Sequence, residues 1–257
     1  MHRFANLMTP LVVLALIGCS KVPSIPEGAG RLEIRLTDAP ADFEAVNITF
    51  SEISAHIDSQ WITISVDTVT VNLLEFTNGK TVELSSANVP VGRYTQIRLK
   101  IVNAEVIVSG QTIPVTVPSG AQSGLKLIAN FNIIEGETVE LMLDFDARRS
   151  IITTGPPHDP HSYRLKPTIR VITKTETGSV SGRVSNPEHL TVAYAIAGSD
   201  TVATTAIEKS NGKFMLGFLT AGVYLVCIED TLNQAYSNDH VEITAGANTQ
   251  LGTITLH

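Results

Sequence analysis

Cysteine, aromatic residues and positive charge are all scarce in this chain of 257 residues. Cys19 and Cys227 are its two cysteines, so a small fold stapled by several disulfides is excluded. Lysine and arginine number 18 against 25 aspartates and glutamates, which gives a net charge of −7. Because nucleic-acid phosphates require a basic face, this balance predicts that nucleic acid is not a partner.

The apolar run near the N-terminus, Leu7 to Ile17, is too short to span a bilayer, which takes about 20 apolar residues. His2 and Arg3 precede this run, and a small residue, Gly18, follows it. A short basic segment, an apolar segment and a small residue form the pattern of a secretory signal peptide. We therefore predict that residues 1–18 are a signal peptide that is removed.

The residues Leu16-Ile17-Gly18-Cys19 resemble the lipobox of bacterial lipoproteins. The resemblance implies that Cys19 carries a lipid and that the membrane is a partner. Ser20, rather than aspartate, follows Cys19, and this implies sorting to the outer membrane by similarity to Gram-negative lipoproteins. An ordinary signal peptide with a chance cysteine is the alternative, and the side of the membrane is left open. Residues 19–30 contain two prolines and little to bury, which predicts a semi-extended tether.

Beyond the tether, apolar residues recur at every second position, and no segment has a sustained helical period. Leu32, Ile34 and Leu36, for example, share one face of the first predicted strand. Many short strands at this spacing predict an all-β chain of two tandem β-sandwiches, immunoglobulin-like or transthyretin-like. A change of phase at Ser51-Glu52 indicates a β-bulge, and Asn78-Gly79 favours a tight hairpin turn.

The alternation also predicts where some strands begin and end. It predicts one strand over residues 163–171, in which Pro167 favours an edge position or a bulge. It predicts separate strands over residues 93–102 and 105–108, and a single strand over residues 69–76. Thr173 to Gly178 contains no apolar residue, so we place the domain boundary there. The predicted segments are a signal peptide (1–18), a lipidated tether (19–30), a first domain (31–173) and a second domain (178–257).

A glycine-rich hairpin in the second domain resembles that of carboxypeptidase regulatory-like, transthyretin-like domains. The residues that carry the resemblance are Gly212-Lys213-Phe214 and Phe218-Leu219-Thr220-Ala221-Gly222-Val223-Tyr224. The resemblance implies a non-catalytic sandwich that binds, spaces or stiffens. Val89-Pro90-Val91-Gly92-Arg93-Tyr94 repeats the device in the first domain, which indicates either related sandwich topologies or convergent turn chemistry.

Five segments of the first domain together resemble a family of bacterial lipoprotein domains of unknown function, family 4382. They occur in the order of that family and cover almost all of residues 31–172. The resemblance implies location and fold and assigns no chemistry. The segments are Arg35 to Pro40, Gly92 to Leu99, Ser123 to Leu127, Leu143 to Ala147 and Leu165 to Val171.

Asp144 and Asp146 lie on the polar face of a predicted strand, so their carboxylates point the same way. Paired carboxylates could perform general acid-base chemistry, as in glycosidases. Arg148, Arg149 and the basic residues of the strand near Arg170 could instead pair with them across the sheet. We favour the ion pairs and keep Asp144 and Asp146 as a possible surface site.

The proline-rich segment Thr153 to Ser162 carries His158, Asp159 and His161. Imidazole and carboxylate groups bind zinc, copper or nickel. These three residues are one ligand short of most structural sites, and the prolines explain a rigid exposed turn without a metal. We favour the turn, and we keep His158, Asp159 and His161 as candidate metal ligands.

No nucleophile elbow and no phosphate-binding glycine loop occurs in the sequence. Cys227 sits within an apolar strand, where a buried inert thiol is expected. Trp61 is expected in the core, because aromatic residues make up only 5% of the chain. No residue is therefore assigned to catalysis.

Taken together, these patterns predict a non-enzymatic lipoprotein of the outer membrane that acts as a binding or scaffold module in the cell envelope. Its ligand would be an unidentified protein or glycan, and no cofactor is expected. The alternative is a metal-binding or metal-dependent envelope protein that uses zinc or another divalent metal at His158, Asp159 and His161. A third, weaker possibility is a hydrolase that uses Asp144 and Asp146.

Overall fold

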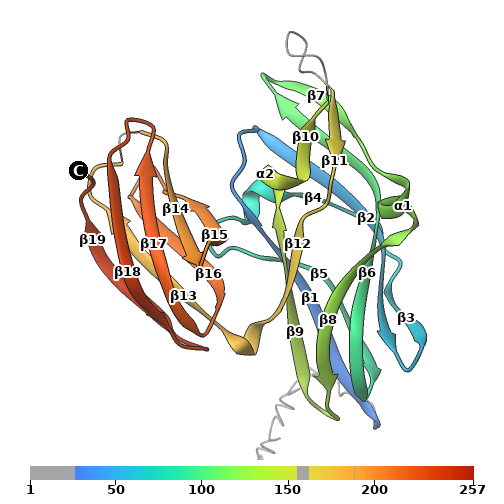
Figure 1. Cartoon of the computed structure of the whole chain (residues 1–257). Coiled ribbons are helices and arrows are strands. Elements are labelled where there is room, and N and C mark those ends of the chain that lie inside the picture. The colour runs from blue at the N-terminus through green and yellow to red at the C-terminus, as the bar shows by residue number, and fades with distance from the viewer. Residues whose placement is uncertain (1–26, 155–161, 188) are drawn as a thin grey trace, which may run out of the picture.

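The computed structural model describes residues 27–154, 162–187 and 189–257, which fold almost entirely into strands. Two β-sandwiches lie side by side (Figure 1). Each has its own hydrophobic core, and the two cores share no residue. The predicted all-β sandwich class is therefore confirmed. No helix in the described part of the chain is long and apolar enough to cross a membrane.

Two groups of predicted residues lie outside the described part of the chain. The first is the lipobox with Cys19. The second is the candidate metal loop with His158, Asp159 and His161. Their roles therefore stay predictions.

The N-terminal sandwich, residues 29–173, contains the following elements in chain order. They are β1 (Ala29–Ala39), β2 (Ala45–Ile57), β3 (Gln60–Ser65), β4 (Val69–Asn72), the 3-10 helix η1 (Leu73–Phe76), β5 (Val82–Pro90), β6 (Gly92–Val108), β7 (Gln111–Thr116), α1 (Ser119–Gly124), β8 (Leu125–Ile133), β9 (Thr138–Asp146), α2 (Ala147–Ser150), β10 (Ile151–Thr153), β11 (Tyr163–Leu165) and β12 (Ile169–Thr173). One sheet has the order β12-β9-β1-β5, and the other has the order β10-β11-β7-β6-β2-β3, with β4 added to β2 and β8 added to β6.

The C-terminal sandwich, residues 177–257, follows the short 3-10 helix η2 (Lys174–Glu176). Its strands are β13 (Thr177–Val184), β14 (Thr191–Ala197), β15 (Asp200–Ala206), β16 (Lys213–Thr220), β17 (Gly222–Asp230), β18 (Ala235–Ile243) and β19 (Asn248–Ile254). They form one sheet in the order β16-β13-β19 and another in the order β15-β14-β17-β18.

Alternating side chains place the core between the sheets of each sandwich, as a strand of period two requires. Leu32, Ile34 and Leu36 of β1 are fully buried in the N-terminal core. The predicted bulge is confirmed, because the pairing of β2 with β6 shifts register between Phe50 and Glu52. Asn78-Gly79 forms the expected tight turn with positive φ at both residues, but it joins η1 to β5 instead of two paired strands.

The structure departs from the predicted strands in three places. The segment over residues 163–171 is two strands in different sheets, β11 and β12, and Pro167 lies in the crossing between them. Proline fits there because it has no N–H to give to either ladder. Residues 92–108 form one strand, β6, whose two halves pair with β8 and β7. Residues 69–76 divide into β4 and η1.

The two sandwiches share one topology. In the N-terminal sandwich, β1 pairs in parallel with β9 and antiparallel with β5. In the C-terminal sandwich, β13 makes the same pairings with β19 and β16. The opposite sheets also correspond, because β8-β6-β2-β3 has the connectivity of β18-β17-β14-β15. The hairpin device that recurs in the sequence therefore marks equivalent positions of two related folds.

A tyrosine closes the same corner in each sandwich. Tyr94 donates its hydroxyl hydrogen bond to the carbonyl of Pro90 at 2.9 Å, and Tyr224 donates to the carbonyl of Thr220 at 2.8 Å. The glycine two residues before each tyrosine, Gly92 or Gly222, has a φ of 142° or 156°. Each tyrosine thus ties the start of one strand to the end of the preceding strand in the other sheet.

The turn at Asn78 joins the sandwiches to one another. Its side-chain Oδ1 accepts hydrogen bonds from Met215 N at 2.7 Å and from Thr205 Oγ1 at 3.2 Å. Its Nδ2 donates to Glu208 Oε1 at 3.3 Å. Asn78 tolerates its φ of 61° because asparagine is among the residues that adopt left-handed backbone. One residue of the N-terminal sandwich therefore fixes the position of β15 and β16 beside it.

Candidate functional site

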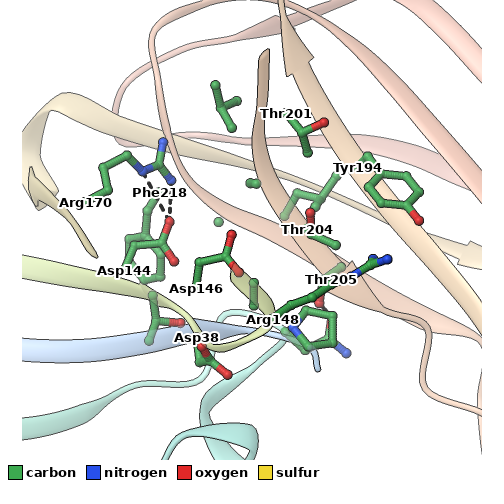
Figure 2. A pocket seen from close by; sticks show the side chains of 18 of the residues that line it. Asp38, Asp144, Asp146, Arg148, Arg170, Tyr194, Thr201, Thr204, Thr205 and Phe218 are labelled. Carbon is green, nitrogen blue, oxygen red and sulfur yellow. Dashed lines mark hydrogen bonds and ion pairs between the residues drawn. The ribbon is translucent and has the colours of Figure 1, made fainter. Parts of the chain in front are cut away.

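A cleft with a volume of about 500 Å³ lies between the two sandwiches, beside the Asn78 contact. One wall is the outer face of β1, β9 and β12 together with α2, and the other is formed by β14, β15 and β16. Figure 2 shows Asp38, Asp144, Asp146 and Arg170 on the first wall, and Tyr194 and the threonines of β15 on the second. The volume falls in the range of about 300–1,000 Å³ that is typical of small-ligand sites.

Asp38 ends the core face of β1 and lines the cleft, although only 5% of it is exposed. Its Oδ1 accepts a hydrogen bond from the backbone N–H of Ala147 at 2.9 Å. Its buried Oδ2 has no hydrogen-bond partner among the described residues. Burial raises the pKa of Asp38 well above its ordinary value, the Ala147 N–H opposes this, and the charges of Asp144 and Asp146 add to the rise.

Asp144 forms an ion pair with Arg170 of the neighbouring strand. Both Arg170 Nη2 and Nε donate to Asp144 Oδ2, at 2.6 Å and 3.2 Å. The pair is directly opposed in register across β9 and β12. Burial raises the pKa of Asp144, and the Arg170 charge partly offsets this effect. The cross-strand ion pair that we favoured from the sequence is therefore present at this carboxylate.

Asp146 is the N-cap of α2. Its Oδ1 accepts a hydrogen bond from Arg149 N at 2.8 Å, and its Oδ2 lies 3.8 Å from Arg149 Nε. Aspartate is a favoured N-cap because its oxygen satisfies an N–H that has no partner inside the helix. The cap turns the chain sharply after β9, and Arg148 and Arg149 then reach the cleft. Arg148 extends toward the wall that carries Tyr194 and Thr205 (Figure 2).

Phe218 enters the cleft because of an irregularity in β16. The pairing of β13 with β16 shifts register between Gly178 and Val180, and Phe218 opposite has a φ of 57°. A left-handed backbone costs roughly 1–3 kcal/mol for a residue other than glycine, and such strain concentrates at functional sites. The bulge re-aims the ring, which lines the same cleft as the Asp144–Arg170 pair (Figure 2).

The described residues offer neither a metal site nor a free catalytic pair in this cleft. No group of three histidine, cysteine or acidic residues within the described ranges is arranged to hold a metal ion. Asp144 is neutralised by Arg170, and Asp146 serves a helix cap. What the cleft offers instead is a dense set of hydrogen-bond acceptors and donors held in fixed positions.

The other residues considered from the sequence lie outside the cleft. Cys227 is on the outer face of β17 and is half-buried instead of sealed in the core; burial raises the pKa of its thiol. Trp61 was expected in the core, but it lies half-buried on the outer face of β3. The Arg98 guanidinium covers its ring at 4.5 Å, and His56 packs beside it. This cation–π contact explains how an indole stays on the surface.

Sequence reasoning missed most of the cleft. Asp38 appeared only within the Arg35 to Pro40 segment of the family resemblance, although the period of two places it on the buried face of β1. The residues Tyr194, Thr201, Thr204 and Phe218 read as ordinary strand residues. Only Asp144 and Asp146 were candidates. The remaining signal was the Thr37-Asp38-Ala39-Pro40 segment, which stood out as part of a family motif.

Comparison with protein families identifies the N-terminal sandwich. Residues 29–167 match the model of the family described as "Domain of unknown function (DUF4382)". The chain belongs to the DUF4382 family. The DUF4382 match includes Asp38, Asp144 and Asp146, whereas Arg170 lies just beyond it. No curated protein matches the chain.

Several solved bacterial structures resemble the chain distantly. They include the Bacillus anthracis TIE protein, with 11% identity over 90% of this chain and 34% of that chain and a TM-score of 0.23. A fimbrial protein from Bacteroides ovatus has 9% identity over 89% and 50% of the two chains, with a TM-score of 0.24. A C-terminal fragment of pilus adhesin SpaC from Lactobacillus rhamnosus GG has 10% identity over 89% and 97%, with a TM-score of 0.21.

The chain therefore spans 34% of the first of these proteins and 50% of the second. These similarities are too low to assign a function to the DUF4382 chain.

Proposed function

We propose that this DUF4382 protein is a non-catalytic binding or scaffold module of the cell envelope, and that the cleft between its sandwiches is the ligand site. The observation that carries the proposal is the cleft itself, which gathers polar groups from both sandwiches. The Asp144–Arg170 pair and the Asp146 cap hold these groups in place before a ligand arrives. Binding then costs less conformational entropy than ordering them on contact.

The absence of a catalytic role rests on how the carboxylates are used. A general acid-base pair needs two carboxyl groups that are free to exchange protons with a substrate. Asp144 Oδ2 accepts two hydrogen bonds from Arg170, and Asp146 Oδ1 accepts one from a backbone N–H. Both groups are therefore suited to recognition more than to proton transfer.

A filled-cleft variant tests the ligand site. Thr204→Trp places an indole in the cleft, and Thr253→Trp places one on an exposed position of β19 as the matched control. The full chain is screened by thermal unfolding against a panel of oligosaccharides and a panel of peptides. We expect at least one compound to raise the Tm of the wild type and of Thr253→Trp but not of Thr204→Trp. Stabilisation that persists in Thr204→Trp, or no stabilisation by any compound, contradicts the cleft as the ligand site.

The envelope location rests on Cys19 and has its own test. The lipid-bearing protein is expected to partition into detergent, because acyl chains add about 0.8 kcal/mol of membrane affinity per buried methylene. Cys19→Ser should move the protein to the aqueous phase. Mass spectrometry of the mature N-terminus should find a lipid on Cys19, and an unmodified soluble wild type would contradict the anchor.

A further inference from the structure

The cleft presents acceptors and donors in adjacent pairs. A carboxylate has two oxygens with about four acceptor sites, and a guanidinium has only donors. Arg170 uses Oδ2 of Asp144, while Oδ1 receives no hydrogen bond from the described residues. Asp146 keeps Oδ2 beyond hydrogen-bond distance of Arg149 Nε. Two acceptor oxygens therefore remain for a ligand, each next to an arginine.

The opposite wall adds hydroxyl groups. Thr201 and Thr204 of β15 and Tyr194 of β14 line the cleft, and their hydroxyls form no hydrogen bond with other described side chains or backbone in the structure. Each hydroxyl can both donate and accept. Asp38 also lines the cleft, and its Oδ2 is a buried oxygen that has no partner among the described residues. Native proteins rarely leave such an oxygen unsatisfied.

Phe218 adds an apolar surface to these polar groups. Its ring lines the cleft from the bulged part of β16, on the wall opposite Asp144 and Arg170. A ligand that matches the two walls together carries hydroxyls along its edges and a flat apolar face. Sugar rings have both features, since their hydroxyls donate and accept in turn and their C–H faces pack on aromatic rings.

Other ligand classes fit the cleft less well. A peptide strand would bind by adding to a sheet edge. At the β16 edge, however, Asn78 Oδ1 already occupies the N–H of Met215 at 2.7 Å. A polyphosphate or nucleic acid would be repelled, because each of Arg149 and Arg170 stands beside an aspartate and the whole chain carries a charge of −7.

We propose that the cleft binds a saccharide, whose neighbouring hydroxyls donate to Asp144 Oδ1 and Asp146 Oδ2 while its ring face packs on Phe218. This inference rests on the proposed function, because it names the ligand class of the same cleft. Arg148, from the wall that carries Asp144 and Asp146, and the β15 hydroxyls, from the wall that carries Phe218, complete the contacts around the edge of the ring.

The test uses the full chain and a panel that contains maltohexaose, cellohexaose, chitohexaose and trigalacturonic acid, with a peptide panel alongside. Binding is measured by calorimetry for wild type, Asp146→Asn and Arg148→Ala. Asp146→Asn keeps the helix cap, because asparagine also accepts from Arg149 N, but it removes the charge. Arg183→Ala is the matched control, because Arg183 is an exposed residue of β13 that does not line the cleft.

We expect one of these saccharides to bind the wild type and Arg183→Ala equally, and to bind Asp146→Asn and Arg148→Ala at least tenfold more weakly. If only peptides bind, and Thr204→Trp abolishes that binding, the saccharide assignment is wrong while the cleft remains the ligand site. If saccharides bind but Asp146→Asn and Thr204→Trp leave the affinity unchanged, both the assignment and the cleft are wrong. Failure of every saccharide also overturns the assignment.

Discussion

The two sandwiches have the same seven-strand topology but serve the cleft differently. The same backbone hydrogen bond occurs in the equivalent turn of each sandwich. Gly136 N donates to Ala29 O at 3.0 Å, and Gly246 N donates to Thr177 O at 2.9 Å. The N-terminal sandwich adds β4, β7, β10, β11 and β12 to the common plan. One of these additions, β12, supplies Arg170, and the α2 segment between β9 and β10 supplies Arg148. The shared plan thus gives the scaffold and the strands that carry the aspartates of the cleft, and the additions give its arginines.

Asp38 and Asn186 are a pair of equivalent residues that show the same division between the shared scaffold and what the N-terminal sandwich adds. Asp38 lies at the end of the first strand of its sandwich and Asn186 lies just after the first strand of the other. Both accept a backbone hydrogen bond through Oδ1, from Ala147 N and from Leu256 N. Asn186 shows that an amide meets this structural requirement. The buried carboxyl of Asp38 is therefore an addition of the N-terminal sandwich, and it lies where the cleft does.

The largest effect is expected at the glycine that begins each sandwich. A Cβ on Gly30 would lie 2.5 Å from the carbonyl oxygen of Ile134, and one on Gly178 would overlap the carbonyl oxygen of Thr244. Gly30→Ala and Gly178→Ala should each lower the free energy of unfolding of their own sandwich by about 3 kcal/mol. Hydrogen exchange resolved by mass spectrometry reports each sandwich separately.

Gly120→Ala is the control for both variants, because its Cβ would meet no atom within 4 Å. It should leave exchange unchanged. If one of Gly30 and Gly178 tolerates alanine and the other does not, the two sandwiches are not equivalent at this turn.

The next effect concerns the contact that joins the sandwiches. Asn78→Ala removes three side-chain hydrogen bonds, and each is worth about 1 kcal/mol in net terms. We expect the sandwiches to uncouple, with a larger radius of gyration in solution scattering and faster exchange at Met215 N. Asn72→Ala, which loses bonds within the N-terminal sandwich only, is the control. Unchanged scattering from Asn78→Ala would show that the cleft does not depend on this residue.

A smaller effect is expected at the two tyrosine corners. Tyr94→Phe and Tyr224→Phe each remove a hydroxyl bond to the backbone four residues earlier, which should cost about 1 kcal/mol, and Tyr224→Phe also removes a bond with Thr220 Oγ1. Denaturant unfolding measures the loss. Tyr194→Phe, whose hydroxyl has no hydrogen bond to the described residues, should cost nothing measurable in stability. A loss confined to one corner would mean that the corners have different roles.

Asp38 and Asn186 should differ in pH dependence. The pKa of Asp38 is raised in the fold, so the folded state holds its proton more tightly than the unfolded state. Its contribution to stability is then full below its ordinary pKa of 3.8 and is lost as the pH rises through the raised value. Asp38→Asn should flatten this part of the curve of unfolding free energy against pH.

Asp144 also has a raised pKa and keeps its own contribution in both proteins, so the difference between wild type and Asp38→Asn isolates Asp38. A parallel pair of pH curves would contradict a raised pKa at Asp38. The C-terminal sandwich should show no such change, since Asn186 does not ionise.

Much of the scaffold could be predicted from the strand period alone. The alternation at Leu32, Ile34 and Leu36 assigns β1 and its buried face correctly, and the phase change near Glu52 locates the bulge. Strand ends were less predictable. Pro167 did not show that the chain changes sheets between β11 and β12, because the same residue also fits an edge or a bulge within one strand.

The candidate site could be predicted only in part. Asp144 and Asp146 could be recognised from the sequence because two acidic residues at alternate positions of a predicted strand place their carboxylates on the same face. Asp38 was hidden, since an aspartate two residues before a proline has the ordinary chemistry of a turn. Phe218 was hidden as well, because its left-handed backbone follows from the register of β16 against β13 and not from its neighbours in sequence.

Apolar residues at every second position form one continuous face on a strand, but they are spread around a helix. The sequence by itself therefore determined the class of fold. It also determined the related hairpins, since glycine and tyrosine at Gly92-Tyr94 and Gly222-Tyr224 carry their own local geometry. Only the tertiary structure decided the cleft. Its walls come from segments as distant in the sequence as Asp38 and Phe218, and Asn78 bonds to Met215 beside the place where they face each other. Such a contact depends on how two finished sandwiches face each other, and no local pattern of residues encodes that.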